Sequence, residues 1–364
     1  MLVNDKIKNI LEKLQDNGFT AYVVGGFVRD YLLGIETYDV DIATSAQPKD
    51  VRVIFDLNNA NDDNYGSILI KDKLYNYDIT TYRKELKYEN RRPVEYEFVS
   101  TIDEDIARRD FTINSLYMDS SGKIYDKVDG LKDLEDKTIR MIGNISDKMT
   151  EDPLRMLRAV RFSANLDFKL ENNLKNYIKQ NTQLLRTVSY NRKKEELDKI
   201  FSSSKSGLGI NLIRELKLEN DLDIVIPDNI VESINSIGTW AQIEVKGDYP
   251  FSNQEKDMID KIKKILGYGI IDNIVLYEYG LYPSIIASDI LGFNRNYISD
   301  LYKNLPIYSS KDIEINGDEI IDLLKIEPGS IIKDIIRDIE LNILNGNLEN
   351  KKEILKEYIS KNWR

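Results

Sequence analysis

Apolar residues recur along the first part of the chain in two patterns, one typical of helices and one typical of strands. Residues 5–17 carry apolar side chains at positions 7, 10, 11 and 14, a spacing that predicts an amphipathic helix. Short helices are also expected at 27–33, 48–55 and 103–108. Between them, β-branched and aromatic runs predict strands at 21–24, 38–43, 67–70, 75–80 and 96–99. This alternation predicts a small mixed α/β domain that ends near Gly143.

The pattern changes after residue 144, where helical periods follow one another. The strongest of them predict helices at 150–164, 171–181, 192–202 and 208–217, and weaker helical periods continue to the C-terminus. We therefore expect an α+β protein in which a mixed head precedes an all-helical remainder. The expected divisions are a head at 1–143, a neck at 144–205, a body at 206–300 and a tail at 301–364.

Composition limits the chemistry more than it limits the fold. The 364 residues are enough for two or more domains, and 41% hydrophobic and 31% charged residues are ordinary for a soluble protein. The chain has no cysteine and no histidine. Disulfides, thiolate or imidazole metal sites and a Ser-His-Asp triad are therefore excluded. Any catalysis has to use carboxylates, Lys, Tyr, Arg and hard metal ions such as Mg²⁺.

Charge and hydropathy bear on location and partners. No apolar run reaches the length of a membrane span, and the N-terminus lacks the apolar core of a signal peptide, so we expect a cytoplasmic protein without a membrane partner. The formal net charge is −11, so RNA binding would depend on a local basic patch. Residues 83–92 offer one, with five basic and two acidic side chains. The oligomeric state stays open between a monomer and a homodimer.

The segment YVVGGFVRDYLLGIETYDVDIAT, at 22–44, joins two short motifs. Gly25 and Gly26 lie between a predicted strand and a predicted helix, where glycines let the backbone approach a phosphate at the positive end of the helix. Asp39 and Asp41 are two residues apart in the next predicted strand, so both carboxylates point to one face. Each motif alone also fits a turn or a solvated strand edge. Together they predict a site for a metal-bound nucleoside triphosphate.

This combination resembles the signature of the polymerase-β-like nucleotidyltransferases. Within that group it is similar to the family of class II tRNA nucleotidyltransferases (CCA-adding enzymes) and bacterial poly(A) polymerases. The resemblance implies a polymerase-β-like head in which Gly25, Gly26 and Arg29 hold the triphosphate. It also implies that Asp39 and Asp41 are catalytic and bind Mg²⁺.

Two further motifs in the head resemble the same family. The segment YNYDITTYR, at 75–83, is similar to a family strand that carries an acidic residue, which implies that Asp78 is a third catalytic carboxylate. RRDFTIN, at 108–114, matches a family motif without a mismatch. Guanidinium groups grip phosphate bidentately, and a carboxylate can accept from a ribose hydroxyl. The resemblance implies that Arg109 contacts the nucleotide and that Asp110 lies near the sugar; solvated carboxylates and an exposed ion pair are the alternatives.

The segment EDPLRMLRAVR, at 151–161, carries the family motif EDxxRxxR. Asp152 and Arg155 are three residues apart, so we expect them on one face of a helix, where the carboxylate can accept from the amino group of C or A while the guanidinium donates to the adjacent ring nitrogen. G and U present a carbonyl beside an N–H, so both contacts would be mispaired. The resemblance implies such selection of C and A by protein side chains, with Arg158 and Arg161 directed to the triphosphate. A capped helix with solvated arginines is the alternative.

Three weaker similarities extend the comparison toward the C-terminus. Arg192 and Glu196 are similar to an RxxxE motif of the family's neck and imply an orienting salt bridge between positions i and i+4. Residues 82–93 lie where CCA-adding enzymes carry a flexible loop. Residues 315–355 are similar to the tail of Gram-positive CCA-adding enzymes.

These resemblances imply an enzyme that adds C, C and A to the 3′ end of tRNA without a template. It would use CTP, ATP and Mg²⁺ in a two-metal mechanism, release pyrophosphate and grip the tRNA acceptor arm with its helical parts. Two alternatives stay open. One is a bacterial poly(A) polymerase or a CC- or A-only adding enzyme of the same family, and the other is an RNA-binding protein with an inactive nucleotidyltransferase head.

Overall fold

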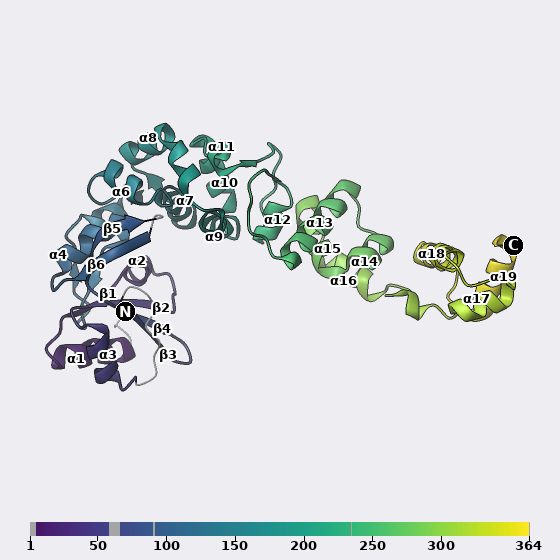
Figure 1. Ribbon diagram of the computed structural model, residues 1–364, viewed down its shortest axis with the longest axis horizontal. Coiled ribbons are helices and arrows are strands. Elements are labelled where there is room, and N and C mark those ends of the chain that lie inside the picture. Colours follow the sequence, from purple (N-terminus) through teal and green to yellow (C-terminus); the bar gives the residue numbers. More distant parts are fainter. Residues whose placement is uncertain (1–4, 58–65, 90–91, 234, 364) are drawn as a thin grey trace. The chain divides into compact units, whose positions relative to one another are not determined.

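The computed structural model describes residues 5–57, 66–89, 92–233 and 235–363, which form two compact units. Unit 1 ends at Ile224 and unit 2 begins at Val225. Figure 1 shows that the strands of the main sheet all belong to unit 1 and that unit 2 is built mainly of helices. The mixed sheet followed by a largely helical remainder confirms the α+β prediction. The four-part division at 143, 205 and 300 stays a prediction, and its 206–300 segment spans the boundary between the two units.

A six-stranded mixed sheet forms the N-terminal part of unit 1. Its strands are β1 (Ala21–Val24), β2 (Asp39–Thr44), β3 (Ser67–Lys71), β4 (Asn76–Thr81), β7 (Tyr117–Met118) and β8 (Ile124–Tyr125). They are ordered β3-β4-β2-β1-β7-β8. Strands β2 and β4 run parallel, and the other neighbouring pairs run antiparallel. The strands and helices expected up to residue 81 are all present, with ends shifted by no more than a residue or so.

The two faces of this sheet differ in character because side chains alternate along each strand. Val23 lies opposite Ile42 on one face, and both are fully buried. The helices α1 (Asp5–Asp16) and α3 (Pro48–Phe55) lie together against this part of the sheet (Figure 1). One register position further, Val24 lies opposite Asp41 on the other face. The predicted acidic residues therefore lie on the sheet face opposite the one that packs against α1.

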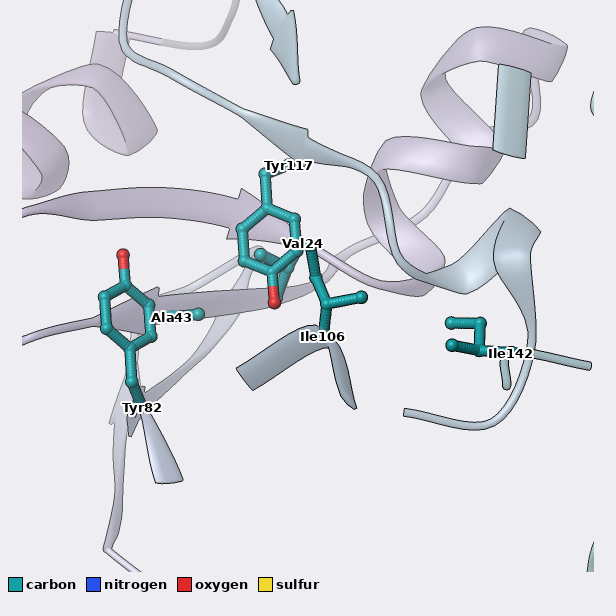
Figure 2. Packing of buried hydrophobic residues seen from close by; sticks show 6 residues of the cluster. All are labelled: Val24, Ala43, Tyr82, Ile106, Tyr117 and Ile142. Atoms are coloured by element: carbon teal, nitrogen blue, oxygen red, sulfur yellow. The ribbon is translucent and has the colours of Figure 1, made fainter. Parts of the chain in front are cut away.

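The second face also has an apolar cluster, which packs the sheet against the segments that follow it. Figure 2 shows its six buried members, Val24, Ala43, Tyr82, Ile106, Tyr117 and Ile142. Ile106 lies on α4 (Ile102–Arg108), so burial of this side chain fixes the helix that precedes the RRDFTIN segment. The cluster thus holds β1, β2 and α4 in one arrangement next to the acidic positions.

The segment expected to be a loop at 82–93 is largely a β-hairpin. Strands β5 (Arg83–Glu89) and β6 (Arg92–Phe98) pair antiparallel, with register shifts near Glu85 and Lys87. Strand β5 was not predicted, because its largely charged sequence RKELKYE lacks the sustained apolar alternation of a half-buried strand. Residues 90–91, between the two strands in the sequence, lie outside the described residues.

The rest of unit 1 consists of short helices and two short strands. The helices are α2 (Gly26–Leu33), η1 (Thr112–Asn114), α5 (Gly130–Glu135), α6 (Ile145–Glu151), α7 (Arg155–Leu166), α8 (Asn172–Gln180), η2 (Thr182–Thr187), α9 (Tyr190–Phe201), α10 (Ser206–Glu215) and α11 (Glu219–Leu222). Strands β9 (Thr138–Ile139) and β10 (Lys169–Leu170) pair parallel. Three of the four helices expected after residue 144 are present, and the fourth is divided in two.

Unit 2 continues the helical pattern to the end of the chain. Between the short strands β11 (Ile224–Val225), at the boundary, and β12 (Glu244–Val245) lies the first helix, α12 (Ser236–Trp240). The others are α13 (Asn253–Tyr268), α14 (Asn273–Tyr279), α15 (Leu281–Leu291), α16 (Arg295–Lys303), η3 (Ser310–Asp312), α17 (Gly317–Leu324), α18 (Ile331–Leu344) and α19 (Lys352–Asn362). Within the residues that the structure describes, every helix is too short or too polar to cross a membrane.

Gly209 allows α10 to pack closely against α9, which gives a test of this arrangement. A Cβ added at Gly209 would lie 2.4 Å from Cγ2 of Ile200. Alanine favours helices over glycine by up to about 1 kcal/mol, but overpacking a core costs about 1–3 kcal/mol. We therefore expect Gly209→Ala to lower the melting temperature in calorimetry. The matched control is Gly267→Ala on α13, where an added Cβ meets nothing within 4 Å, and this variant should be neutral or slightly stabilised. Equal melting temperatures of Gly209→Ala and the wild type would contradict the packing argument.

Candidate active site

Three carboxylates lie on one face of the sheet, contributed by two neighbouring strands. Along β2, Val40 and Ile42 are buried while Asp39 and Asp41 are exposed, so the two aspartates share the other face. Asp41 lies directly beside Asp78 in the parallel register of β2 and β4. The sheet thus brings together the three acidic positions expected from the sequence.

A glycine backbone approaches one of these carboxylates closely. Gly25 has φ 74° and ψ −141°, a conformation that favours glycine. A Cβ added there would lie 2.8 Å from Oδ2 of Asp41. The helix α2 begins at the next residue, Gly26, so its free N–H groups start beside the carboxylate. Any side chain at position 25 would displace Asp41, which gives a physical reason for glycine here.

Desolvation and neighbouring negative charge raise the pKa of Asp41. Desolvation by the surrounding protein and the charges of Asp78 and Asp39 raise its pKa from 3.8 to about 6, against the opposing influence of Arg109 and Arg29. Asp41 keeps one side accessible to solvent, since it lines a pocket. A carboxylate under this repulsion gains from any cation that reaches it.

The other two carboxylates are held by polar neighbours. Oδ1 of Asp39 accepts a hydrogen bond from Nδ2 of Asn76 at 2.8 Å. Oδ1 of Asp78 accepts from the hydroxyl of Ser67 and, at 3.3 Å, from that of Thr80. These contacts limit the rotation of both side chains, so the acidic face has a defined shape before any ligand binds.

These side chains suit Mg²⁺ held by few protein ligands. Among the described residues, no three acidic side chains converge into a complete metal site. Mg²⁺ in nucleotide-binding proteins is commonly held by one or two carboxylates, with water and substrate phosphates as the remaining ligands. Asp39 and Asp41, two apart on one strand face with Asp41 repelled by its neighbours, fit that mode.

A pocket of about 420 Å³ opens beside these carboxylates. Asp41 and Asp78 line it on one side, and three arginines, Arg83, Arg108 and Arg109, complete its polar wall. Of the three arginines, only Arg109 is predicted from the sequence to contact a nucleotide. Arg83 and Arg108 join it because β5 begins where β4 ends and because α4 ends at this wall. The pocket therefore combines negative charge for a metal with positive charge for a phosphate.

A buried aspartate that the sequence did not reveal holds this arginine wall in place. Asp105 is fully buried and pairs with Arg108 at 2.7 Å and with Arg109 at 2.8 Å. The hydroxyl of Tyr117 donates to the same carboxylate at 2.6 Å. Burial alone would raise the pKa of Asp105, but the two guanidinium groups and the hydrogen bonds lower it to about 2. Its spacing of three and four residues from the two arginines is the signal that could have found it.

Asp110 and Arg158 join the head to the helix α7. Nε of Arg158 donates to Oδ2 of Asp110 at 2.7 Å, and Nη2 lies 2.5 Å from the same atom. Burial would raise the pKa of Asp110, but the charge of Arg158 lowers it. Both residues belong to predicted nucleotide-binding motifs, and the fold brings these motifs into contact across 48 positions of sequence.

Arg29 is oriented from two sides. Its Nε and Nη2 donate to the two carboxylate oxygens of Asp30 at 2.8 and 2.9 Å. Its Nη1 donates to Oδ1 of Asn114, the last residue of the RRDFTIN segment, at 2.6 Å. Arg29 is nearly buried, so a polar partner on each side compensates for the loss of water. Asn114 is thus a further member of the site that the sequence motif contained but did not single out.

The prediction of one continuous helix at 150–164 is wrong, because the helix is interrupted within the EDPLR segment. Helix α6 ends at Glu151 and α7 begins at Arg155. Asp152 has φ −147° and ψ 97°, the extended backbone that a following proline favours. The Oδ1 of Asp152 accepts from the N–H of Leu154 at 3.1 Å, in a turn that precedes α7, whose N-cap residue is Leu154 without a side-chain cap. Asp152 and Arg155 are therefore neighbours across a helix junction and not residues on one helix face.

The partners of this pair come from other elements. Arg192 on α9 donates to both oxygens of Asp152, at 3.1 and 2.7 Å. Arg155 is buried, and its Nη1 donates to the carbonyl oxygen of Lys148 at 2.6 Å and to Oε2 of Glu151 at 2.8 Å. Both side chains are fixed in orientation, and the carboxylate of Asp152 keeps capacity for a further hydrogen bond.

The salt bridge expected between Arg192 and Glu196 is replaced by two longer-range pairs. Arg192 binds Asp152, whereas Glu196 accepts from Nε of Arg161 at 2.7 Å and from Lys199 at 3.2 Å. Glu196 is almost completely buried, so it stabilises Arg161 in a region with little water. The two residues of this motif orient site residues on other elements instead of each other.

Comparison with protein-family models agrees with this geometry. Residues 21–140 match the family described as "Poly A polymerase head domain". Residues 167–227 match "Probable RNA and SrmB- binding site of polymerase A", and residues 245–359 match "tRNA nucleotidyltransferase domain 2". The first match covers the sheet, Gly25, the three carboxylates and the RRDFTIN segment.

Comparison with whole proteins extends the similarity to nearly the full chain. A CCA-adding enzyme of Ligilactobacillus salivarius is 34% identical over 385 aligned residues, which cover 97% of this chain and 95% of that protein. One of Lactococcus lactis subsp. cremoris is 33% identical, with 94% and 92% covered. The crystal structure of the Bacillus stearothermophilus CCA-adding enzyme in complex with CTP superposes with a TM-score of 0.85 at 26% identity, covering 98% and 96% of the two chains. This chain belongs to the class II CCA-adding enzymes of the poly(A) polymerase and tRNA nucleotidyltransferase family.

Proposed function

We propose that this protein adds C, C and A to the 3′ end of tRNA from CTP and ATP, without a nucleic-acid template and with release of pyrophosphate. The RNA's 3′-hydroxyl attacks the α-phosphate of the nucleotide in line. The observation that carries this proposal is the carboxylate of Asp41, which lies against the backbone of Gly25, beside Asp78 and within the electrostatic influence of Arg109 and Arg29. A triphosphate and a hydroxyl nucleophile both have to reach such a point in this reaction.

Asp39 and Asp41 would hold Mg²⁺, the cofactor of this proposal, and Asp78 is the third catalytic carboxylate. When bound, Mg²⁺ supplies Lewis-acid stabilisation of the phosphate charge and lowers the pKa of the attacking hydroxyl. The chain's own contribution is to present the carboxylates on a rigid sheet and to limit their rotation by Asn76 and Ser67. A preorganised site of this kind needs little rearrangement when substrate arrives.

The triphosphate is held by backbone and guanidinium donors. Gly25 and Gly26 leave the N-terminus of α2 open to a phosphate. Arg29, Arg158 and Arg161 provide charge, and each is already oriented by an acidic partner.

The sugar and the base are bound by residues further along the chain. Arg109 contacts the nucleotide at the pocket wall, and Asp110 lies near the ribose. Asp152 accepts from the amino group of C or A while Arg155 donates to the adjacent ring nitrogen. Arg192 orients Asp152, and the break between α6 and α7 supports the pair at a helix junction.

The tRNA is gripped by the helical parts of the chain, through shape and phosphate contacts along the acceptor arm. This assignment rests on the family, since CCA-adding enzymes cover nearly the whole chain, and the match to "tRNA nucleotidyltransferase domain 2" lies at 245–359. The hairpin β5–β6 begins at Arg83 on the pocket wall, so its first residue lies close to the proposed reaction site.

The direct test is incorporation of labelled CTP and ATP into tRNA that lacks its 3′ end. The wild type should add C, C and A and then stop. Asp41→Ala should lower the rate on the order of a hundredfold or more, because a carboxylate at the reacting phosphates is lost. Asp16→Ala, an exposed carboxylate change on α1, is the control and should leave the rate unchanged. Unlimited addition of A would support a poly(A) polymerase instead, and no incorporation would support an RNA-binding protein with an inactive head.

The raised pKa of Asp41 predicts a pH-dependent stability. Its pKa is about 6 in the folded protein and 3.8 ordinarily, so ionisation opposes folding as the pH rises from about 4 through about 6. In the presence of a chelator, Asp41→Asn should therefore melt at a higher temperature than the wild type above pH 6, and the two should converge below pH 4. Added Mg²⁺ should stabilise the wild type more than the variant. A wild type that melts above Asp41→Asn in chelator at neutral pH would contradict the raised pKa of Asp41 in the folded protein.

Base selection has its own test in Arg155. Arg155→Ala should reduce the preference for C and A over U and G by roughly tenfold to a hundredfold, because a bidentate base contact contributes about 1–3 kcal/mol of discrimination. Competition between labelled nucleotides measures this ratio. Arg186→Ala, a paired but mostly exposed arginine of the same unit, is the control. An unchanged ratio in Arg155→Ala would mean that another group reads the base.

A further inference from the structure

One aromatic ring lies beneath three of the arginines assigned to the triphosphate. The guanidinium carbons of Arg161, Arg29 and Arg158 lie 4.3, 5.4 and 5.5 Å from the centroid of the Phe162 ring. Phe162 belongs to α7, is 7% exposed and lies four residues after Arg158, one helical turn away. Arg29 comes from α2, so the ring joins two elements far apart in the sequence.

The orientation of this ring is set by a second aromatic residue. Phe111, in the RRDFTIN segment, is fully buried and packs edge to face with Phe162. The two centroids are 5.6 Å apart, and the planes are inclined by 77°. Edge-to-face packing is a preferred geometry of aromatic pairs, because the positive edge of one ring meets the negative face of the other. The ring of Phe162 is therefore held in one plane while the guanidinium groups gather around it.

Three positive charges around one ring repel each other in a region with little water. Each arginine has its own acidic partner: Arg29 has Asp30, Arg158 has Asp110 and Arg161 has Glu196. These partners are three different residues, so no one of the three pairs holds the arginines together. The ring of Phe162 attracts all three, because the negative charge of its face favours a cation within about 6 Å. An aliphatic side chain of similar size would fill the space without this attraction.

We propose that Phe162 is a positioning residue for the triphosphate, whose ring gathers the guanidinium groups of Arg29, Arg158 and Arg161 into one site by cation–π attraction. The proposal rests on the proposed function, since it takes these arginines as the triphosphate ligands. It assigns no base contact to the ring. Loss of the ring's charge distribution should thus weaken CTP and ATP equally and leave the choice of base unchanged.

The test is a comparison of Phe162→Leu with a protein carrying pentafluorophenylalanine at position 162. Leucine removes the ring, and the fluorinated ring keeps its shape but reverses its charge distribution. For both changes we expect KM for CTP and for ATP to rise about tenfold by a common factor, with a smaller change in kcat. Phe162→Tyr, which keeps the ring, should retain a KM near that of the wild type. Binding of a non-hydrolysable CTP analogue, measured by calorimetry, should weaken in parallel.

Two controls separate positioning from packing and from the proposed function. Phe168→Leu removes another buried aromatic side chain of unit 1 and should lower the melting temperature without raising KM. Arg158→Ala should raise KM; if it does not, the assignment of the triphosphate ligands is wrong and so is the role of the ring. If Arg158→Ala raises KM while the fluorinated protein keeps the wild-type KM, the ring proposal alone is overturned. A rise in KM for Phe168→Leu equal to that for Phe162→Leu would also overturn it.

Discussion

The desolvation of Asp41 beside two other carboxylates is the constraint on which the rest of the site depends. Desolvation raises the pKa of Asp41, and the charges of Asp78 and Asp39 on the same sheet face raise it further, to about 6. The backbone of Gly25 allows this crowding, because it leaves room for the Asp41 carboxylate where any side chain would collide. A fold that concentrates negative charge in this way has to supply positive charge nearby. Arg29 and Arg109 do so from two separate elements.

The arginines of the site also need partners of opposite charge. A guanidinium in a region with little water is costly unless it is paired, so each of these side chains has an acidic partner. Asp105 holds the pocket wall, Asp110 holds Arg158 and Glu196 holds Arg161. These pairs keep the arginines in place without a substrate. They also show how a chain with a formal net charge of −11 keeps several guanidinium groups fixed at one site.

Several elements could be predicted from the sequence because their signals are local. The alternation of Val40 and Ile42 with Asp39 and Asp41 identified both the strand and its acidic face. Part of β6 was predicted as a strand at 96–99, but β5 could not be found in this way, because its sequence RKELKYE is largely charged. The helix expected at 150–164 failed for a different reason: proline restricts the residue before it, and Asp152 ends α6.

By itself, the sequence determined the strand and helix periods, the acidic pair, the glycine turn and the absence of histidine and cysteine chemistry. Only the tertiary structure decided which side chains hold the site in place. Arg29 meets Asn114 across 85 positions of sequence, Asp152 meets Arg192 across 40 and Arg161 meets Glu196 across 35. Local patterns follow from covalent geometry and from the few neighbours on one element. A partner for a buried charge is chosen by how separate elements pack together, and that choice has no local signature.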